Sequence, residues 1–149
     1  MRRLLLFILL LFASLFASNA RESKKTQLTP EEHIKRAEQY YKKKDFWQTL
    51  WHYDKARMKV KSKGKAKELV KIMNRIFWEA IVYKIENKQI TTTTGAVTFL
   101  EGRIEKKKKE KLDHKDATEV LKMLQQKQYN NAMERIRKIL EKENSDGDK

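Results

Sequence analysis

Three histidines have the widest chemical repertoire in this chain. His33, His52 and His114 could take part in acid–base chemistry or bind a metal, because imidazole titrates near neutral pH and is a common metal ligand. None lies in an HExxH-type motif, and none has two or more further ligands at helical spacing. On a helix, His52 and Asp54 would point to different faces. The spacing predicts neither a metal site nor a catalytic histidine.

The other reactive side chains form no catalytic pattern either. Residues 62–65 (SKGK) lack the glycine spacing and the preceding strand of a phosphate-binding P-loop. The carboxylates show no recognisable acid–base pairing. The chain has no cysteine, which excludes disulfides and thiolate metal sites. We therefore expect no catalytic residue, no metal and no cofactor, and a protein that is not an enzyme.

A tryptophan pair indicates binding instead of catalysis. Trp47 and Trp51 are one helical turn apart, so their side chains should share a face. Five of the eight positions in residues 46–53 are large and apolar or aromatic: Phe46, Trp47, Leu50, Trp51 and Tyr53. Exposed tryptophan is enriched at binding hot spots. The alternative is that residues 21–29 or the helix expected at 66–86 cover the pair.

Lysine-rich stretches are the second candidate for binding. The net charge is +15, and basic residues dominate residues 57–67 and 103–111. The lysines that could form an anion-binding face are Lys59, Lys61, Lys63, Lys65, Lys67, Lys106, Lys107, Lys108 and Lys109. Such an excess attracts anionic surfaces. The alternative is that these lysines are ordinary solvated side chains.

The first 20 residues predict export. Arg2 and Arg3 precede an apolar run over 4–12, and small residues end in Ser-Asn-Ala, which indicates cleavage after Ala20. An uncleaved anchor is the alternative, although the run is shorter than the roughly 20 residues a spanning helix needs. Cleavage removes two of the 35 basic residues and none of the 20 acids, which leaves +13. We expect a periplasmic or secreted protein, more typical of bacteria, that meets anionic lipid or polysaccharide and not nucleic acid.

Hydrophobic periodicity predicts six helices at about 30–43, 46–59, 66–86, 95–111, 116–126 and 128–142. Thr29, Pro30 and Glu32 form a capping box at the first helix, and Asp45 should cap the second. Residues 57–67 read as a solvated connection with frayed helix on both sides, and 89–94 (QITTTT) as a loop that ends in a threonine N-cap. The third helix is apolar all round and should be central. Residues 21–29 are expected to be a flexible lead-in, and 143–149 a disordered tail.

Residues 30–61 resemble a tetratricopeptide repeat (TPR), a 34-residue helix–turn–helix unit. With Pro30 at position one, the matching residues are Ala37 at eight, Tyr40 and Tyr41 at eleven and twelve, Asp45 and Phe46 at sixteen and seventeen, Tyr53 at twenty-four and Ala56 at twenty-seven. The departures are His33, Arg36, Thr49 and Lys61. Residues 113–142 resemble the repeat more weakly, and the middle helices fall outside its register.

The resemblance implies an all-α fold of three antiparallel helical hairpins stacked as a short TPR-like α-solenoid, with a plain helical bundle as the alternative. It also implies docking of a partner on the first helices, through Glu31, Ile34, Glu38, Tyr41 and Lys42. Trp47 and Trp51 would face outward on the second helix. The family's clamp for a C-terminal carboxylate is not matched.

The expected function is an exported protein–protein docking module whose partner-binding residues are Trp47, Trp51, Glu38, Tyr41 and Lys42. The alternative is a cationic envelope-associated protein that binds anionic lipid headgroups or polysaccharide through its lysines. A stack this short could also self-associate, which would bury ends that otherwise need caps.

Overall fold

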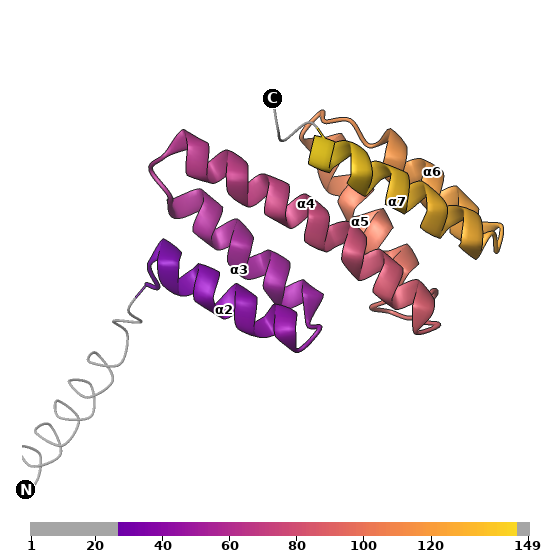
Figure 1. The fold of residues 1–149 in the computed structure, drawn as a ribbon, viewed down its shortest axis with the longest axis horizontal. Coiled ribbons are helices and arrows are strands. Elements are labelled where there is room, and N and C mark those ends of the chain that lie inside the picture. Colours follow the sequence, from indigo (N-terminus) through magenta and orange to yellow (C-terminus); the bar gives the residue numbers. More distant parts are fainter. Residues whose placement is uncertain (1–26, 146–149) are drawn as a thin grey trace, which may run out of the picture.

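Six α-helices make up the computed structural model, which describes residues 27–145 (Figure 1). They are α2 (Pro30–Lys42), α3 (Phe46–Lys59), α4 (Lys63–Glu86), α5 (Ala96–Lys109), α6 (Lys115–Gln125) and α7 (Tyr129–Ser145). The described residues contain no strand. The all-α prediction is therefore confirmed. The predicted signal peptide and most of the lead-in lie outside the described residues.

A side-chain hydrogen bond caps the N-terminus of each of the first three helices. The Thr29 hydroxyl accepts from the backbone N–H of Glu32, whose carboxylate accepts from the Thr29 N–H at 2.7 Å, so the predicted capping box is present. The Asp45 carboxylate caps α3 as predicted, by accepting from the Gln48 N–H at 3.1 Å. Ser62 does the same for α4. Each cap satisfies an amide that the helix itself leaves unpaired.

Because Ser62 caps α4, the predicted long connection at 57–67 is wrong. Helix α3 continues to Lys59 and α4 begins at Lys63, so only residues 60–62 join them. The first turn of α4 is helical despite Gly64, because the serine oxygen replaces a missing hydrogen-bond acceptor. At the other end of the chain, α7 extends to Ser145 and takes in the start of the predicted disordered tail.

The threonine N-cap expected before α5 is also wrong. Gly95 is the N-cap and makes no side-chain capping bond. Instead, the carbonyls of Gln89 and Ile90 accept from the first two amides of α5, at 2.9 and 3.0 Å. This backbone cap brings the loop very close to Gly95. A Cβ there would stand 2.6 Å from the Ile90 carbonyl oxygen, so the position requires glycine.

Four helices end in the same way, with a lysine where glycine is usual. Lys44, Lys88, Lys111 and Lys127 have φ between 55° and 59° and follow the C-caps of α2, α4, α5 and α6. In each case two backbone amides bond back into the last turn, the pattern of a Schellman motif. The left-handed conformation strains a residue with a side chain. In return, each of these lysines places a cation at the negative end of a helix dipole, which is favourable.

Helix α4 is the centre of the packing. It contacts α3, α5 and α7, and α2 reaches the rest of the fold only through α3 and side chains. Figure 1 shows α2, α3 and α4 side by side, with α6 and α7 beyond them. Helix α7 returns to α4, so that α4, α5, α6 and α7 close into a ring. The prediction that this apolar helix is central is confirmed.

No helix of the described part of the chain combines the length and the apolar character required to cross a bilayer. The apolar side chains of α4, the longest helix, are packed against three neighbouring helices. Ile76, Ala80 and Ile81 on this helix are at most 3% exposed. Its sequence is therefore explained by burial inside the fold.

Candidate docking groove

Helices α3 and α5 both lie on α4, and their backbones stay apart, so that only side chains such as Trp47 and Phe99 meet across the groove between them. Three adjoining cavities of about 250, 490 and 570 Å³ lie along it. The 250 Å³ cavity lies in the middle and shares Trp47 and Phe99 with the 570 Å³ cavity. With the 490 Å³ cavity it shares Met73, Asp54, Arg103 and Lys106. We call this feature the α3–α5 groove. Its floor is α4, represented by Met73 and Phe77.

Both tryptophans lie on the rim of the α3–α5 groove. Trp47 is 67% exposed and Trp51 is 47% exposed, so neither helix α4 nor any other described segment covers them. The indole of Trp47 meets the ring of Phe99 edge-on, with centroids 5.6 Å apart. Trp51 instead leans on the rings of His33 and His52. The two indoles share the rim without stacking on each other.

Arg103 is a mostly buried cation that lies where two of the three cavities join. Its guanidinium lies 4.3 Å over the ring of Phe77 and donates a hydrogen bond to the Asn74 amide oxygen. Its Nε is buried without a hydrogen-bond partner, and no carboxylate forms an ion pair with it among the described residues. Burial lowers its pKa, an effect that the more distant Glu143 and Glu110 oppose.

Lys84 is a second such cation, near the opposite end. The residue is only 7% exposed, and its Nζ lies 4.6 Å over the ring of Phe99. Burial lowers the pKa of Lys84, and the charge of Asp45 opposes that shift. No ion pair joins Lys84 to another residue in the described range. The negative face of the Phe99 ring attracts the Lys84 ammonium, which offsets part of the cost of its burial.

Seven basic and four acidic residues line the three cavities together. The Asp54 carboxylate is already engaged, at 2.8 Å from Arg57 and 4.0 Å from Lys106. Lys107 adds to the excess near Arg103, and burial together with the charge of Arg103 lowers its pKa. The groove is therefore apolar and aromatic in the middle and basic toward both ends.

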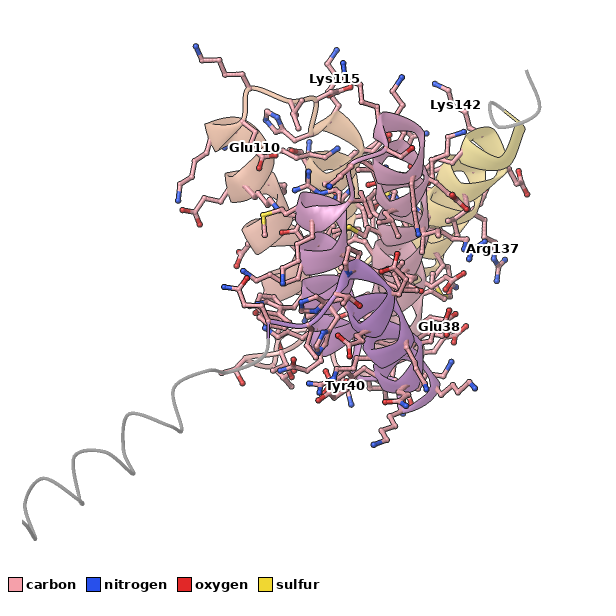
Figure 2. The ribbon with its side chains drawn as sticks, turned by 90° about the vertical axis from the view of Figure 1, so that its left-hand side faces the viewer. Glu38, Tyr40, Glu110, Lys115, Arg137 and Lys142 are labelled. Carbon is pink, nitrogen blue, oxygen red and sulfur yellow. The ribbon has the colours of Figure 1, made fainter. Side chains whose placement is uncertain are left out.

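The remaining predicted partner-binding residues lie away from this groove. Glu38 and Lys42 are exposed on α2, and Figure 2 shows Glu38 on the opposite side of the molecule from Glu110, which lines the groove. Tyr41 is half-buried, and its hydroxyl donates to the Glu79 carboxylate at 2.6 Å. That bond raises the pKa of Tyr41 to about 12. The hydroxyl of Tyr41 thus joins α2 to α4.

The predicted anion-binding lysines fall into two groups at one end of α4. The first surrounds the α3–α4 turn and the second ends α5, which runs antiparallel to α4 (Figure 1). Some have internal partners: Lys59 donates to the Leu28 carbonyl, Lys65 pairs with Glu31 at 3.2 Å, and Lys109 pairs with Glu105 at 2.8 Å. Lys61, Lys63, Lys67 and Lys108 are exposed and form no ion pair with the described residues.

A buried histidine pair went unpredicted. His33 and His52 are 5% and 4% exposed, and their Nδ1 atoms lie 3.0 Å apart, one donating and the other accepting. Tyr40 stacks on His52. Burial lowers the pKa of both rings, and the nearby cations Lys59, Arg36 and Lys55 lower that of His33 further. The available signal was that His33 lies one turn from Ala37 on the buried face of α2.

The pair does not make a metal centre. Within residues 27–145 no three histidine, cysteine or carboxylate side chains converge as metal ligands. Three of the nearby charges are cationic, which opposes a bound cation. The third histidine, His114, lies in the α5–α6 connection with its Nδ1 3.2 Å from the Leu112 carbonyl oxygen. The hydrogen bond between the two buried rings is therefore best explained as part of the packing of α2 on α3.

No protein-family model, curated protein or solved structure matches this chain. Its role must therefore be inferred from the residues themselves. Of these, the α3–α5 groove with its exposed tryptophans is the feature that the packing of the fold does not require.

Proposed function

We propose that this chain is an exported, TPR-like docking module that binds a protein partner and catalyses no reaction. The observation that carries the proposal is the exposed pair Trp47 and Trp51 on the rim of the α3–α5 groove. Large apolar side chains left in solvent beside a concave surface are typical of interaction sites. The predicted contributions of Glu38, Tyr41 and Lys42 stay predictions.

The order of helix contacts supports the TPR-like part of the proposal. The first hairpin (α2, α3) contacts only α4 of the second, and the third (α6, α7) contacts only α4 and α5. Contact between neighbouring hairpins alone is the rule in solenoids. The third hairpin differs from a regular stack because its second helix, α7, meets α4. The resemblance is therefore carried by the first half of the chain.

Site-specific photocrosslinking in cells that express the chain tests the docking function. A photoreactive phenylalanine analogue at position 47 should give a discrete protein adduct, and Trp51→Ser should reduce its yield. The matched control places the same analogue at Arg137, which is exposed on α7 on the other side of the molecule (Figure 2). An identical adduct pattern at both positions, or none at position 47, would contradict the proposal.

The alternative function is binding to anionic lipid headgroups or polysaccharide. Lys61, Lys63, Lys67 and Lys108 support it, because these exposed lysines have no ion-pair partner in the described chain and cluster at one end of α4. Attraction of this kind is screened by salt. Binding to vesicles that contain anionic lipid should therefore be strong at low salt and lost at about 0.5 M. Persistence of protein docking in that salt would favour the tryptophan site instead.

A further inference from the structure

We infer that the α3–α5 groove binds an amphipathic helix of a partner protein that carries acidic residues about three turns apart on its apolar face. This inference rests on the proposed docking function and names the chemistry of the partner. It follows from the shape of the groove, from two of its cations that form no ion pair with a described residue, and from their spacing along α4.

The shape of the groove suits a helix. Its two walls are themselves helices, α3 and α5, and its floor is a third, α4. A rod laid over the groove, above the Trp47–Phe99 contact, can meet the apolar side chains of the middle cavity. The middle cavity is lined largely by apolar and aromatic side chains, with Trp47 and Trp51 on the rim. Amphipathic helices bind in such grooves through residues spaced three and four apart. An extended strand would find no sheet edge here.

The charge of the groove selects an acidic partner. Lys84 and Arg103 are held in the groove against aromatic rings, and neither forms an ion pair with a described residue. Burial is costly for each of them without a paired counter-charge, and more distant carboxylates offset that cost only in part. A carboxylate on the incoming helix would supply that counter-charge and form charge-assisted hydrogen bonds.

The spacing of the two cations predicts the spacing of the acids. Arg103 is bonded to Asn74, which lies ten residues before Lys84 on α4. Ten residues of helix rise about 15 Å. On a partner helix aligned with α4, residues eleven apart rise about 16 Å and return to the same face after three turns. We therefore expect carboxylates at about i and i+11, with apolar residues at the intervening turns.

The chain cannot readily supply this helix itself. Residues 1–26 contain five basic residues and one acidic residue, so their charge repels the groove. A second copy carries a net charge of +15, which opposes self-association through a basic surface. The apolar faces of α6 and α7 are already buried in the fold. The occupant with complementary charge is a different protein.

Three synthetic peptides of about 18 residues test the inference. All share one helical apolar face. They differ only at two positions eleven apart, which carry Glu, Gln or Lys. Binding to the purified full-length chain is followed by the anisotropy of a dye on each peptide. The Glu peptide should bind at least about tenfold more tightly than the Gln peptide, because hydrogen bonds to charged groups contribute more than neutral ones. The Lys peptide should bind most weakly.

Charge-matched variants locate the contacts. Lys84→Met and Arg103→Met remove one charge each and keep an apolar stem of similar length. Each should weaken the Glu peptide about tenfold and leave the Gln peptide unchanged. The control Arg137→Met removes the same charge from the far side and should change neither. Trp47→Ser with Trp51→Ser should abolish binding of both peptides. Thermal unfolding checks that every variant remains folded.

The outcomes separate the inference from the proposed function. Equal affinity for the Glu and Gln peptides overturns the acidic partner. Failure of all peptides, together with a specific photocrosslink at position 47, also overturns the inference and leaves the docking function standing. Failure of both measurements overturns both. Vesicle binding that shields the tryptophans while no peptide binds would assign the groove to a lipid surface and overturn the inference.

Discussion

The first and last helical hairpins have the same architecture but are stabilised by different chemistry. Aromatic and polar groups join α2 to α3: the paired rings of His33 and His52, with Tyr40 stacked on one of them. Between α6 and α7 the buried contacts come from small and aliphatic side chains, namely Ala117, Val120, Leu124, Ala132, Ile136 and Ile139. Outside this core, Arg135 bridges Asp116 and Glu119.

Because of this difference, the stability of the first hairpin can depend on pH, whereas the packing of the last hairpin should not. An aliphatic contact is insensitive to pH, whereas a hydrogen bond between two imidazoles requires at least one neutral ring. The first hairpin also carries the exposed tryptophans, and Trp51 touches both histidines. The hairpin proposed to bind a partner is therefore the one with titratable groups in its interior.

The largest expected effect is in the last hairpin. Ile136 is fully buried, so Ile136→Ala should lower the free energy of unfolding by about 2–5 kcal/mol through lost apolar burial and the cavity left behind. Urea denaturation measures the loss. Ile136→Val, which should cost about 0.5–1.5 kcal/mol, provides a milder variant if the first does not fold. A loss that varied with pH between 5 and 8 would contradict the assignment of this hairpin to aliphatic packing alone.

The second effect is a pH dependence confined to the first hairpin. The pKa values of His33 and His52 lie below the ordinary value of 6.5, so the unfolded chain takes up protons before the folded chain does. Stability is therefore fully present above pH 6.5. It falls as the pH drops toward the folded-state pKa values, by up to about 1.4 kcal/mol per pH unit for each proton. Thermal unfolding between pH 7.5 and 5 measures this.

The control for the histidine pair is His33→Asn combined with His52→Asn. Two amides can keep a hydrogen bond near the Nδ1 positions but do not titrate. The double variant should lose most of the decline in stability below pH 6.5. If the decline persists unchanged, other groups cause it.

A smaller loss is expected from Tyr41→Phe. The change removes the hydrogen bond to Glu79 and should cost about 1 kcal/mol at neutral pH. In the wild type the bond favours the neutral phenol, so its contribution is present below pH 10 and lost as the pH rises through about 12. Absorbance of tyrosinate near 295 nm should show one fewer late-titrating group in the variant. A titration curve of unchanged shape would contradict the bond.

The smallest effect should have the same sign in the two hairpins and be weaker at Lys44, whose ammonium also lies 5.2 Å over the Tyr41 ring. Lys44 and Lys127 both close a hairpin with a positive φ, so Lys44→Gly and Lys127→Gly should each raise stability by up to about 1 kcal/mol. The gain comes from relief of strain, reduced by the greater freedom of glycine in the unfolded chain. Lys138→Gly, in the middle of α7, is the opposite control and should destabilise. A gain at only one of the two turns would show that the strain is not shared.

Much of the fold could be predicted because its signals are local. Thr29 and Glu32 form their capping box within one turn, and α3 begins where predicted because Asp45 caps it. The central place of α4 followed from its apolar surface. One error came from a local cap at Ser62 that was overlooked. The other occurred where a group outside the helix replaced a local one: the backbone cap from Gln89 and Ile90 displaced a threonine cap at α5.

The sequence by itself determined the helices, their buried faces and the tryptophan pair, because each depends on residues three or four positions apart. Only the tertiary structure decided what those residues meet. It separated the backbones of α3 and α5 to open a groove, set Arg103 over Phe77 without an ion pair, and joined His33 to His52 across 19 positions. Such contacts depend on how helices cross, and periodicity within one helix carries no information about that crossing.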